Sequence, residues 1–259
     1  MGLCRVPYAR TLAPDMRQQA SERAEIMTII NANLQAVHAR IERAATAANR
    51  APDSVQLLAV SKTFGHAEVA AAWAAGQRAF GENFVQEALD KIAATRSLAI
   101  EWHFIGPVQG NKTRPIAENF AWVHSVEREK IARRLNDARP PHLPPLNVLI
   151  QVNVSGEASK SDVTPGEEGA LAAVIRTMPR LRLRGLMAIP EPTHDPALQR
   201  QRFALLRRLQ LQLQAEDAGV DTLSMGMSDD LEAAIAEGAT MVRVGSAIFG
   251  ARKPVKSAH

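Results

Sequence analysis

Short apolar runs recur along this chain and are separated by amphipathic stretches. Residues 21–48 carry apolar side chains at spacings of three and four, which predicts one amphipathic helix ahead of the first run. The apolar runs themselves predict strands that are buried on both faces. They cover residues 55–60, 78–81, 100–105, 121–125, 147–154, 181–189, 221–225 and 241–244.

Helical stretches fill the intervals between these runs. They are predicted near residues 67–75, 84–95, 111–119, 128–139, 196–218 and 229–235. Gly76 and Gly238 are expected to end two of these helices, and Ser228 is expected to cap the last one. Strands that alternate with helices favour a single α/β domain with the architecture of a (β/α)8 TIM-type barrel, preceded by the N-terminal helix. An open doubly wound sheet is the second interpretation.

Length and composition agree with one large domain. The chain has 259 residues, of which 46% are hydrophobic, enough for a substantial core. The predicted organisation is a poorly ordered extension over residues 1–21, a barrel over 22–252 and a tail over 253–259. The net charge of +4 is small and the basic residues are scattered, so we expect no nucleic-acid partner.

Cysteine usage and hydropathy indicate the compartment. Cys4 is the only cysteine, so an intramolecular disulfide is excluded. No apolar run approaches the roughly 20 residues that cross a bilayer, and residues 1–21 lack the apolar region of a secretory signal. We therefore expect a cytoplasmic protein with no membrane partner.

Polar residues, and one glycine, lie at or just beyond the carboxyl ends of most of the predicted strands, where barrels place their functional sites. They include Ser61, Lys62, Thr63, Glu82, Asn83, His103, His124, Ser125, Asn153, Ser155, Ser224, Ser228, Arg243, Gly245 and Ser246. A lysine at such a strand end is partly desolvated, which lowers a lysine pKa and favours imine formation. Lys62 is thus the candidate reactive group, and the other interpretation is a lysine that reaches solvent.

Arg243, Gly245 and Ser246 close the last predicted strand, where barrels commonly bind phosphate. Glycine lets the backbone approach a ligand closely. His103 and His124 are interpreted as hydrogen-bonded rim residues, with acid–base catalysis as the alternative. Neither histidine occurs in a metal-ligand spacing, so no metal site is expected.

Seven blocks of this sequence, taken together, resemble the family of pyridoxal phosphate homeostasis proteins. The blocks are residues 58–63 (LAVSKT), 80–87 (FGENFVQE), 102–106 (WHFIG), 109–112 (QGNK), 184–187 (RGLM), 223–230 (LSMGMSDD) and 242–250 (VRVGSAIFG). The resemblance covers about residues 27–252. The sequence departs from the family pattern at Phe84, Gly110 and Asp162, where tyrosine, serine and glycine are usual.

The resemblance implies a barrel similar to the N-terminal domain of alanine racemase, with pyridoxal 5′-phosphate (PLP) held at Lys62 as an internal aldimine. It implies that Ser224, Gly245 and Ser246 hold the phosphate and that Arg243 faces the pyridine nitrogen. Asn83 and Met225 complete the expected cofactor-binding set.

An arginine at the pyridine nitrogen disfavours carbanion chemistry. A racemase also needs a second base, which a tyrosine supplies in enzymes similar to alanine racemase, and the only tyrosine here is Tyr8. We therefore expect a PLP-binding homeostasis protein without catalytic residues, acting as a monomer, with apo-enzymes of the cofactor as candidate partners. The alternatives are a racemase-like PLP enzyme and a phosphate-handling barrel enzyme that does not use PLP.

Overall fold

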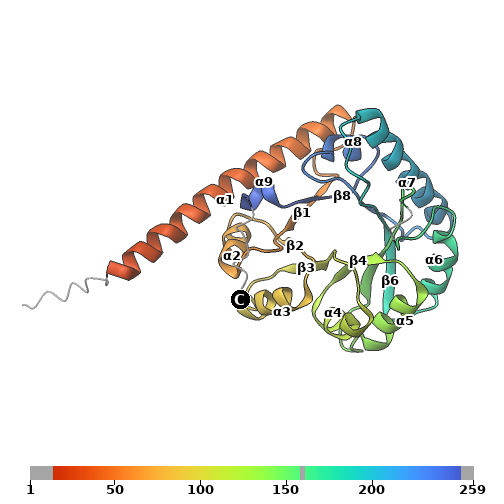
Figure 1. Ribbon diagram of the computed structural model, residues 1–259, viewed down its shortest axis with the longest axis horizontal. Helices are drawn as coiled ribbons and strands as arrows, with labels where there is room; N and C mark the ends of the chain where they lie inside the picture. Colours follow the sequence, from red (N-terminus) through yellow and green to blue (C-terminus); the bar gives the residue numbers. More distant parts are fainter. Residues whose placement is uncertain (1–13, 158–160, 252–259) are drawn as a thin grey trace, which may run out of the picture.

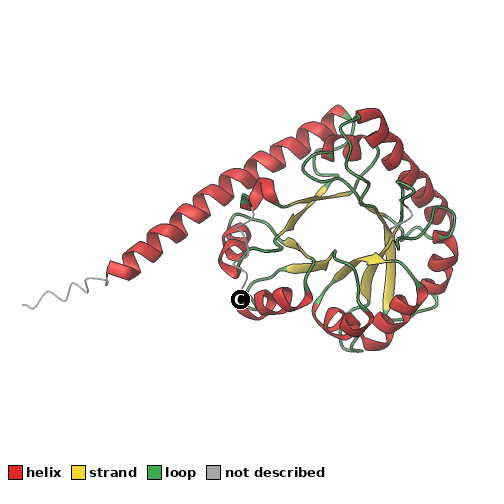
Figure 2. Ribbon diagram, in the orientation of Figure 1, coloured by secondary structure: helices red, strands yellow, loops and turns green. Residues whose placement is uncertain are grey.

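The strands form a closed inner ring, and the helices surround it (Figures 1 and 2). The computed structural model describes residues 14–157 and 161–251. The strands are β1 (Gln56–Val60), β2 (Ala79–Glu82), β3 (Glu101–Phe104), β4 (Trp122–Val126), β5 (Leu146–Gln151), β6 (Leu181–Met187), β7 (Thr222–Ser224) and β8 (Met241–Val244). Each strand pairs in parallel with the next, and β8 pairs with β1. This closure confirms the predicted (β/α)8 barrel over the open sheet.

The helices fall close to the predicted stretches. They are α1 (Pro14–Ala47), α2 (His66–Ala74), α3 (Val85–Ala94), α4 (Thr113–Asn119), α5 (Glu129–Ala138), α6 (Glu168–Arg176), α7 (Pro196–Glu216), α8 (Leu231–Ala236) and α9 (Ser246–Phe249), with a 3-10 turn η1 (Gly110–Lys112). Helix α6 was not predicted from the sequence pattern. The fifth strand ends earlier than predicted, because beyond Gln151 the chain makes only one isolated bridge, between Val152 and Val163.

Helix α1 lies across the junction of β1 and β8, and its N-terminal part projects away from the barrel (Figure 1). It begins at Pro14, ahead of the predicted start at residue 21. Residues 1–13 and 253–259, most of the predicted extension and all of the predicted tail, lie outside the described residues. Buried α1 side chains recur at helical spacing, from Ile30 through Leu34 and Val37 to Ile41. The helix therefore covers the barrel along one apolar stripe.

Inside the barrel, two apolar clusters occupy different sectors. One consists of Leu58, Val60, Ala79, Ile105 and Met241, from the sector of β1, β2, β3 and β8. The other consists of Trp122, Leu149 and Met187, from β4, β5 and β6. Strand side chains that point outward belong instead to the large cluster shared with the helices.

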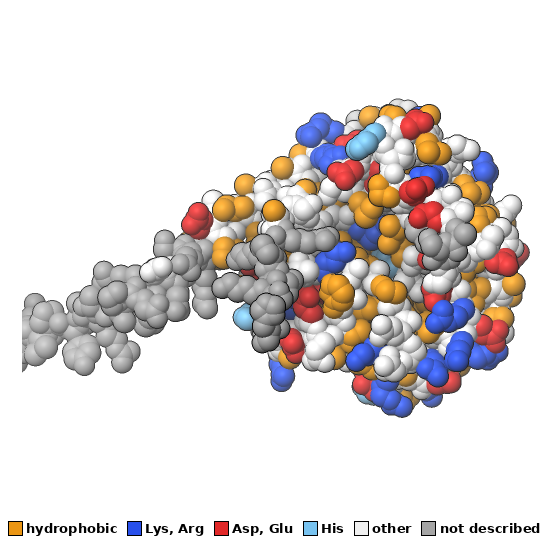
Figure 3. Space-filling model, viewed as in Figure 1, with side chains coloured by type: hydrophobic (Ala, Val, Ile, Leu, Met, Phe, Trp, Pro, Cys, Tyr) orange, Lys and Arg blue, Asp and Glu red, His pale blue; other side chains and the backbone are white. Residues whose placement is uncertain are grey.

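On the side shown in Figure 3, acidic and basic side chains are interspersed over the surface. Among residues 14–157 and 161–251, no helix combines the length and apolar character that crossing a membrane requires.

Candidate functional site

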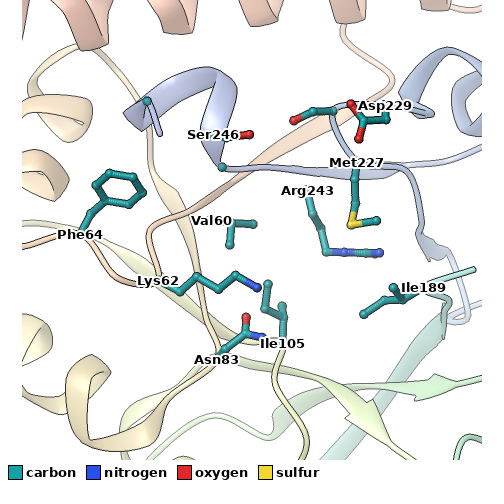
Figure 4. Close-up of a pocket in the computed structure, with 13 residues that line it drawn as sticks. Val60, Lys62, Phe64, Asn83, Ile105, Ile189, Met227, Asp229, Arg243 and Ser246 are labelled. Atoms are coloured by element: carbon teal, nitrogen blue, oxygen red, sulfur yellow. The ribbon is translucent and has the colours of Figure 1, made fainter. Parts of the chain in front are cut away.

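A cavity of about 280 Å³ lies at the carboxyl ends of the strands (Figure 4). Its lining residues are Val60, Lys62, Phe64, Asn83, Ile105, Ile189, Met227, Ser228, Asp229, Arg243, Gly245, Ser246 and Gly250. The lining thus combines apolar side chains with an amine, a guanidinium, a carboxylate, an amide and two hydroxyls. This is the end of a parallel barrel at which active sites and ligand sites lie.

Lys62 reaches this cavity because side chains alternate in direction along β1. Leu58 and Val60 point into the barrel interior, where they pack in the same apolar cluster. Lys62 follows two residues after Val60 and extends into the cavity (Figure 4). The strand therefore determines that the amine faces the cavity.

The residues on either side of Lys62 are fixed by carboxylates. The Ser61 hydroxyl donates a hydrogen bond to Glu82 Oε1 at 2.5 Å. On the other side, the Thr63 amide donates to Glu87 Oε1 at 2.6 Å. Thr63 has φ of +69°, a conformation that is unfavourable for a β-branched residue. These contacts hold the turn that carries Lys62 in this conformation.

Lys91 of α3 joins the same contacts from outside the barrel. Its buried ammonium lies 2.7 Å from Glu82 Oε1 and 2.5 Å from Glu87 Oε1, and it donates to the Ser61 carbonyl at 2.7 Å. Burial raises the pKa of Glu82, and the attraction of Lys91 opposes that rise. Glu82 Oε2 has no hydrogen-bond partner among the described residues, so Lys91 is essential for compensating its buried charge.

Arg243 enters the cavity from β8 and carries a buried guanidinium. Its Nη1 donates to the Ser224 carbonyl at 2.7 Å and to Ser224 Oγ at 2.8 Å, and its Nη2 donates to the Ala188 carbonyl at 2.9 Å. Burial lowers the pKa of Arg243 to about 10, and the charge of Asp230 partly offsets this. Arg243 therefore stays cationic at neutral pH and favours an electron-rich or anionic ligand.

Two histidines extend this hydrogen bonding across the barrel interior. His124 Nδ1 lies 3.0 Å from Ser224 Oγ, and His124 Nε2 lies 2.9 Å from His103 Nδ1. His103 Nε2 lies 2.9 Å from Glu101 Oε1. Burial lowers the pKa of His103. Burial, with repulsion from His103 and Arg243, brings the pKa of His124 well below its ordinary value.

The histidines are therefore not rim residues, in contrast to the sequence prediction. Both are fully buried and neither lines the cavity, because each lies within its strand rather than beyond the strand end. Acid–base chemistry by His103 or His124 on a ligand in this cavity has no geometric support.

Gly245 and Ser246 form one corner of the cavity, together with Ser228. A Cβ added to Gly245 would lie 3.0 Å from the Val60 carbonyl oxygen, so glycine permits close packing of β8 on β1. Ser246 and Ser228 bring two hydroxyls to the lining. This corner can donate hydrogen bonds to an anion, although Asp229 also belongs to the lining.

Ser228 faces the cavity because it does not cap α8, which corrects the sequence prediction. Helix α8 begins at Leu231, with Asp230 at the N-cap position. The Asp230 carboxylate accepts a hydrogen bond from the Met227 amide at 2.6 Å and stabilises the turn before the helix. Burial raises the pKa of Asp230.

Five of the seven residues predicted to bind the cofactor line the cavity, namely Lys62, Asn83, Arg243, Gly245 and Ser246. Ser224 and Met225 do not. Ser224 points inward beneath the cavity and contacts Arg243, whereas Met225 alternates outward into the large core cluster. Asn83 Oδ1 is buried and has no hydrogen-bond partner among the described residues, so it is available to a ligand.

The predicted cofactor-binding set does not contain Ile105, Ile189 and Ser228, which also line the cavity. Ile105 and Ile189 follow β3 and β6 at the functional end, and that position was the available signal. Phe84 and Gly110, at two departures from the family pattern, are not lining residues. Among the described residues, no group of three or more histidine, cysteine, aspartate or glutamate side chains is placed to hold a metal ion.

Sequence comparisons agree with the resemblance. Residues 32–253 match the family model of the alanine racemase N-terminal domain. The pyridoxal phosphate homeostasis proteins of Pseudomonas aeruginosa and Escherichia coli are 62% and 53% identical to this chain over 226 and 232 residues. Each alignment covers 87% of this chain, and they cover 97% and 98% of the two relatives.

Solved structures give the same result at the level of the fold. PipY of Synechococcus elongatus, solved with PLP bound, is 35% identical with a TM-score of 0.73, and the match covers 85% of this chain and all of PipY. Alanine racemase of Corynebacterium glutamicum is 16% identical with a TM-score of 0.67, covering 90% of this chain and 64% of the enzyme. The chain belongs to the alanine racemase N-terminal domain family and, within that fold, to the family of pyridoxal phosphate homeostasis proteins.

Proposed function

We propose that this protein binds PLP covalently at Lys62 and serves in the intracellular homeostasis of that cofactor. The observation that carries the proposal is that Lys62, Arg243 and Ser246 line one cavity, in a chain 62% identical to a protein named for PLP homeostasis. When bound, PLP supplies an aldehyde that condenses with an amine and a ring that withdraws electrons. Among the described lining residues, the amine belongs to Lys62.

The remaining lining residues suit the other parts of the cofactor. The hydroxyls of Ser246 and Ser228, beside Gly245, supply neutral donors for a phosphate. Arg243 supplies a cation for the ring nitrogen, and the unpartnered Oδ1 of Asn83 supplies an acceptor. The donor set therefore fits PLP.

The same lining favours binding over catalysis. Arg243 stays protonated and cannot act as the acidic partner that promotes electron withdrawal by the ring. Within the described lining, the only other ionisable side chains are Lys62 and Asp229, and neither histidine of the barrel interior is present. Among these described lining residues, no histidine or tyrosine is present to act as the second base that racemisation requires. We infer that the protein holds the reactive aldehyde and makes it available to apo-enzymes.

The location and assembly are part of the same proposal. A chain whose only cysteine is Cys4 suits a reducing compartment, which supports the cytoplasm. The eight strands close into a barrel within one chain, so the fold needs no second subunit to complete it, which supports action as a monomer.

Attachment at Lys62 is tested by borohydride reduction of the PLP-loaded protein, followed by peptide mass mapping. The pyridoxyl adduct should lie on Lys62, and Lys62→Ala should lose the visible absorption band. Lys112→Ala is the matched control, because Lys112 is the last residue of the η1 turn and does not line the cavity, and it should keep both signals. A dominant adduct on Lys112 or Lys160 would overturn the assignment.

Binding without turnover is tested by incubating the loaded protein with D- and L-alanine in deuterated water. We expect slow α-deuteration and negligible inversion, since Lys62 can abstract a proton from one face only. Inversion near the roughly 10 per second that is typical of enzymes would reject the non-catalytic role.

A further inference from the structure

A series of hydrogen bonds inside the barrel leads to Arg243, and the function proposed above assigns no role to the other residues of this series. It connects Glu101 at the amino end of β3 to Arg243 at the cavity, through His103, His124 and Ser224. Four contacts of 2.8 to 3.0 Å make it continuous. His103, His124 and Ser224 are fully buried, so their hydrogen-bonding groups depend on one another.

Between Glu101 and His124, the hydrogen bonds allow a single arrangement of protons. The Glu101 carboxylate can only accept, so the Nε2 atom of His103 carries the proton in their contact. A neutral imidazole has one donor and one acceptor nitrogen, which leaves Nδ1 of His103 as an acceptor. Nε2 of His124 must then donate to it.

The second half follows by the same rule. Nδ1 of His124 becomes an acceptor, so the Ser224 hydroxyl donates to it. Arg243 can only donate, and its Nη1 donates to the oxygen of the same hydroxyl. The Ser224 proton is therefore directed toward His124 and away from the cavity.

We propose that Glu101, His103, His124 and Ser224 form a one-way hydrogen-bond chain that orients Arg243, so Ser224 is a positioning residue rather than a phosphate ligand. This inference rests on the proposed function, because it concerns how Arg243 meets the bound cofactor. It differs from the role that the family resemblance implies for Ser224.

The surroundings of the chain contain few charges that compete with this arrangement. Trp122 stacks on His103 with ring centroids 5.3 Å apart, and the Arg184 guanidinium lies 5.0 Å from the Trp122 centroid. Asp230 acts on Arg243 through its charge. Lys62 and Asp229 are the other ionisable groups of the described cavity lining.

A phosphate ligand and a positioning residue differ in their response to the phosphate group. PLP and pyridoxal, which lacks the phosphate, are titrated into wild type, Ser224→Ala and Ser246→Ala. Ser246→Ala should weaken PLP binding about tenfold and leave pyridoxal binding unchanged, because it removes a donor to a charged group. Ser224→Ala should weaken both ligands by the same factor. A loss confined to PLP in Ser224→Ala would overturn the proposal.

The direction of the chain is tested at His124. His124→Phe keeps a ring but removes both nitrogens, which frees the Ser224 proton to turn toward the cavity. The hydroxyl hydrogen of Ser224 carries a partial positive charge, which near the cavity disfavours the protonated form of the bound cofactor. The apparent pKa of the cofactor's visible band should therefore fall by about half a unit. His124→Gln supplies one donor and one acceptor and should restore the wild-type titration.

Gln210→Leu is the control for general destabilisation. Gln210 is buried in α7 and donates to the Val220 carbonyl, outside the chain and the cavity. This variant should lower stability without shifting the titration. Equal titrations for His124→Phe and wild type would reject the one-way hydrogen-bond chain. Failure of the wild-type protein to bind PLP would instead reject the proposed function itself. If His124→Phe does not fold, the two-ligand comparison at Ser224 still decides.

Discussion

The polar network on the outer side of β2 differs from the network inside the barrel in how it accommodates buried charge. The outer network consists of Lys91 between Glu82 and Glu87, with contacts of 2.7 and 2.5 Å. The interior network contains two neutral histidines between the Glu101 carboxylate and one cation, Arg243, whose nearest acceptors are carbonyl and hydroxyl oxygens rather than a carboxylate. One network relies on opposite charges and the other on the directions of hydrogen bonds.

This difference corresponds to what each network positions. The outer network contacts the backbone on both sides of Lys62, through Ser61 and Thr63, and so fixes where the chain runs. The interior network contacts the side chain of Arg243 and so determines how one guanidinium is oriented. Removing a charge should therefore affect stability more in the outer network than removing a hydrogen-bonding group does in the interior.

The largest effect is expected for Lys91→Met. The substitution leaves Glu82 buried without its cation, and breaking a buried ion pair from one side costs about 3–5 kcal/mol. Urea unfolding should show this loss, together with weaker PLP binding because the Lys62 turn loses its anchor. Lys130→Met, at an exposed position of α5, is the matched control and should stay within about 0.5 kcal/mol of wild type.

The double variant Lys91→Met with Glu82→Gln sharpens this test. Replacing Glu82 removes the buried charge that Lys91→Met leaves without a partner, so part of the lost stability should be recovered. The effects of the two substitutions are then non-additive, because the two residues interact. Strict additivity would mean that the ion pair is not what holds the outer network together.

Gly245→Val should have the next largest effect. Its Cβ would lie 3.0 Å from the Val60 carbonyl, so β8 must shift relative to β1, at a cost of about 1–3 kcal/mol. PLP affinity should fall as well, because the same shift moves the corner at Ser246. Gly169→Ala is the control, since a Cβ there meets nothing within 4 Å, and it should not weaken binding. Unchanged PLP affinity in Gly245→Val would remove this corner from the site.

Sequence periodicity predicts most of this fold, because the signal is local. The eighth strand, residues 241–244, is predicted with its observed bounds, and Gly76 follows the end of α2 with φ of +103° as expected. The fifth strand is predicted too long, since Val152 and Val154 are as buried as strand residues but lie beyond the last residue of β5, with only an isolated bridge at Val152. Apolarity alone does not distinguish these two environments.

The candidate site is predicted only in part, because its supporting contacts are long-range. Lys62 and Arg243 follow from strand-end position and from the family resemblance. The partner of His124 lies 100 residues away at Ser224, and the Glu82 carboxylate that accepts from Ser61 lies 21 residues further along the chain. No local pattern reports such distances, so a histidine in the barrel interior was interpreted as a rim residue.

The free energy of unfolding should change with pH in opposite directions for the interior network and the outer network. His103 and His124 have folded-state pKa values below the ordinary 6.5, so the unfolded chain binds more protons as the pH falls below about 6.5, and stability decreases there. Glu82 has a raised pKa, so stability from this group increases as the pH falls through its folded pKa. The interior network should therefore lose stability in acid while the outer one gains.

His124→Gln should remove about 1 kcal/mol of the loss between pH near 7.5 and pH near 5.5, measured by urea unfolding. His142→Gln, at an exposed histidine, should leave the profile unchanged. The same acid loss in both variants would mean that His124 takes up a proton in the folded protein as readily as in the unfolded chain, contrary to the one-way hydrogen-bond chain.

The smallest effect is expected for Arg40→Met, which provides the solvent-exposed reference for both buried networks. Arg40 of α1 makes two contacts with Glu232 of α8, at 2.5 and 2.6 Å, as short as those around Lys91. The two side chains are 34% and 54% exposed, so water already solvates both charges, and the loss should be about 0.2–1 kcal/mol. Raising the salt concentration toward 1 M should reduce that loss further, whereas the effect of Lys91→Met should persist, because buried pairs are screened much less. If Arg40→Met costs as much as Lys91→Met, burial is not what separates strong from weak ion pairs in this barrel, and the contrast between the outer and interior networks must have another cause.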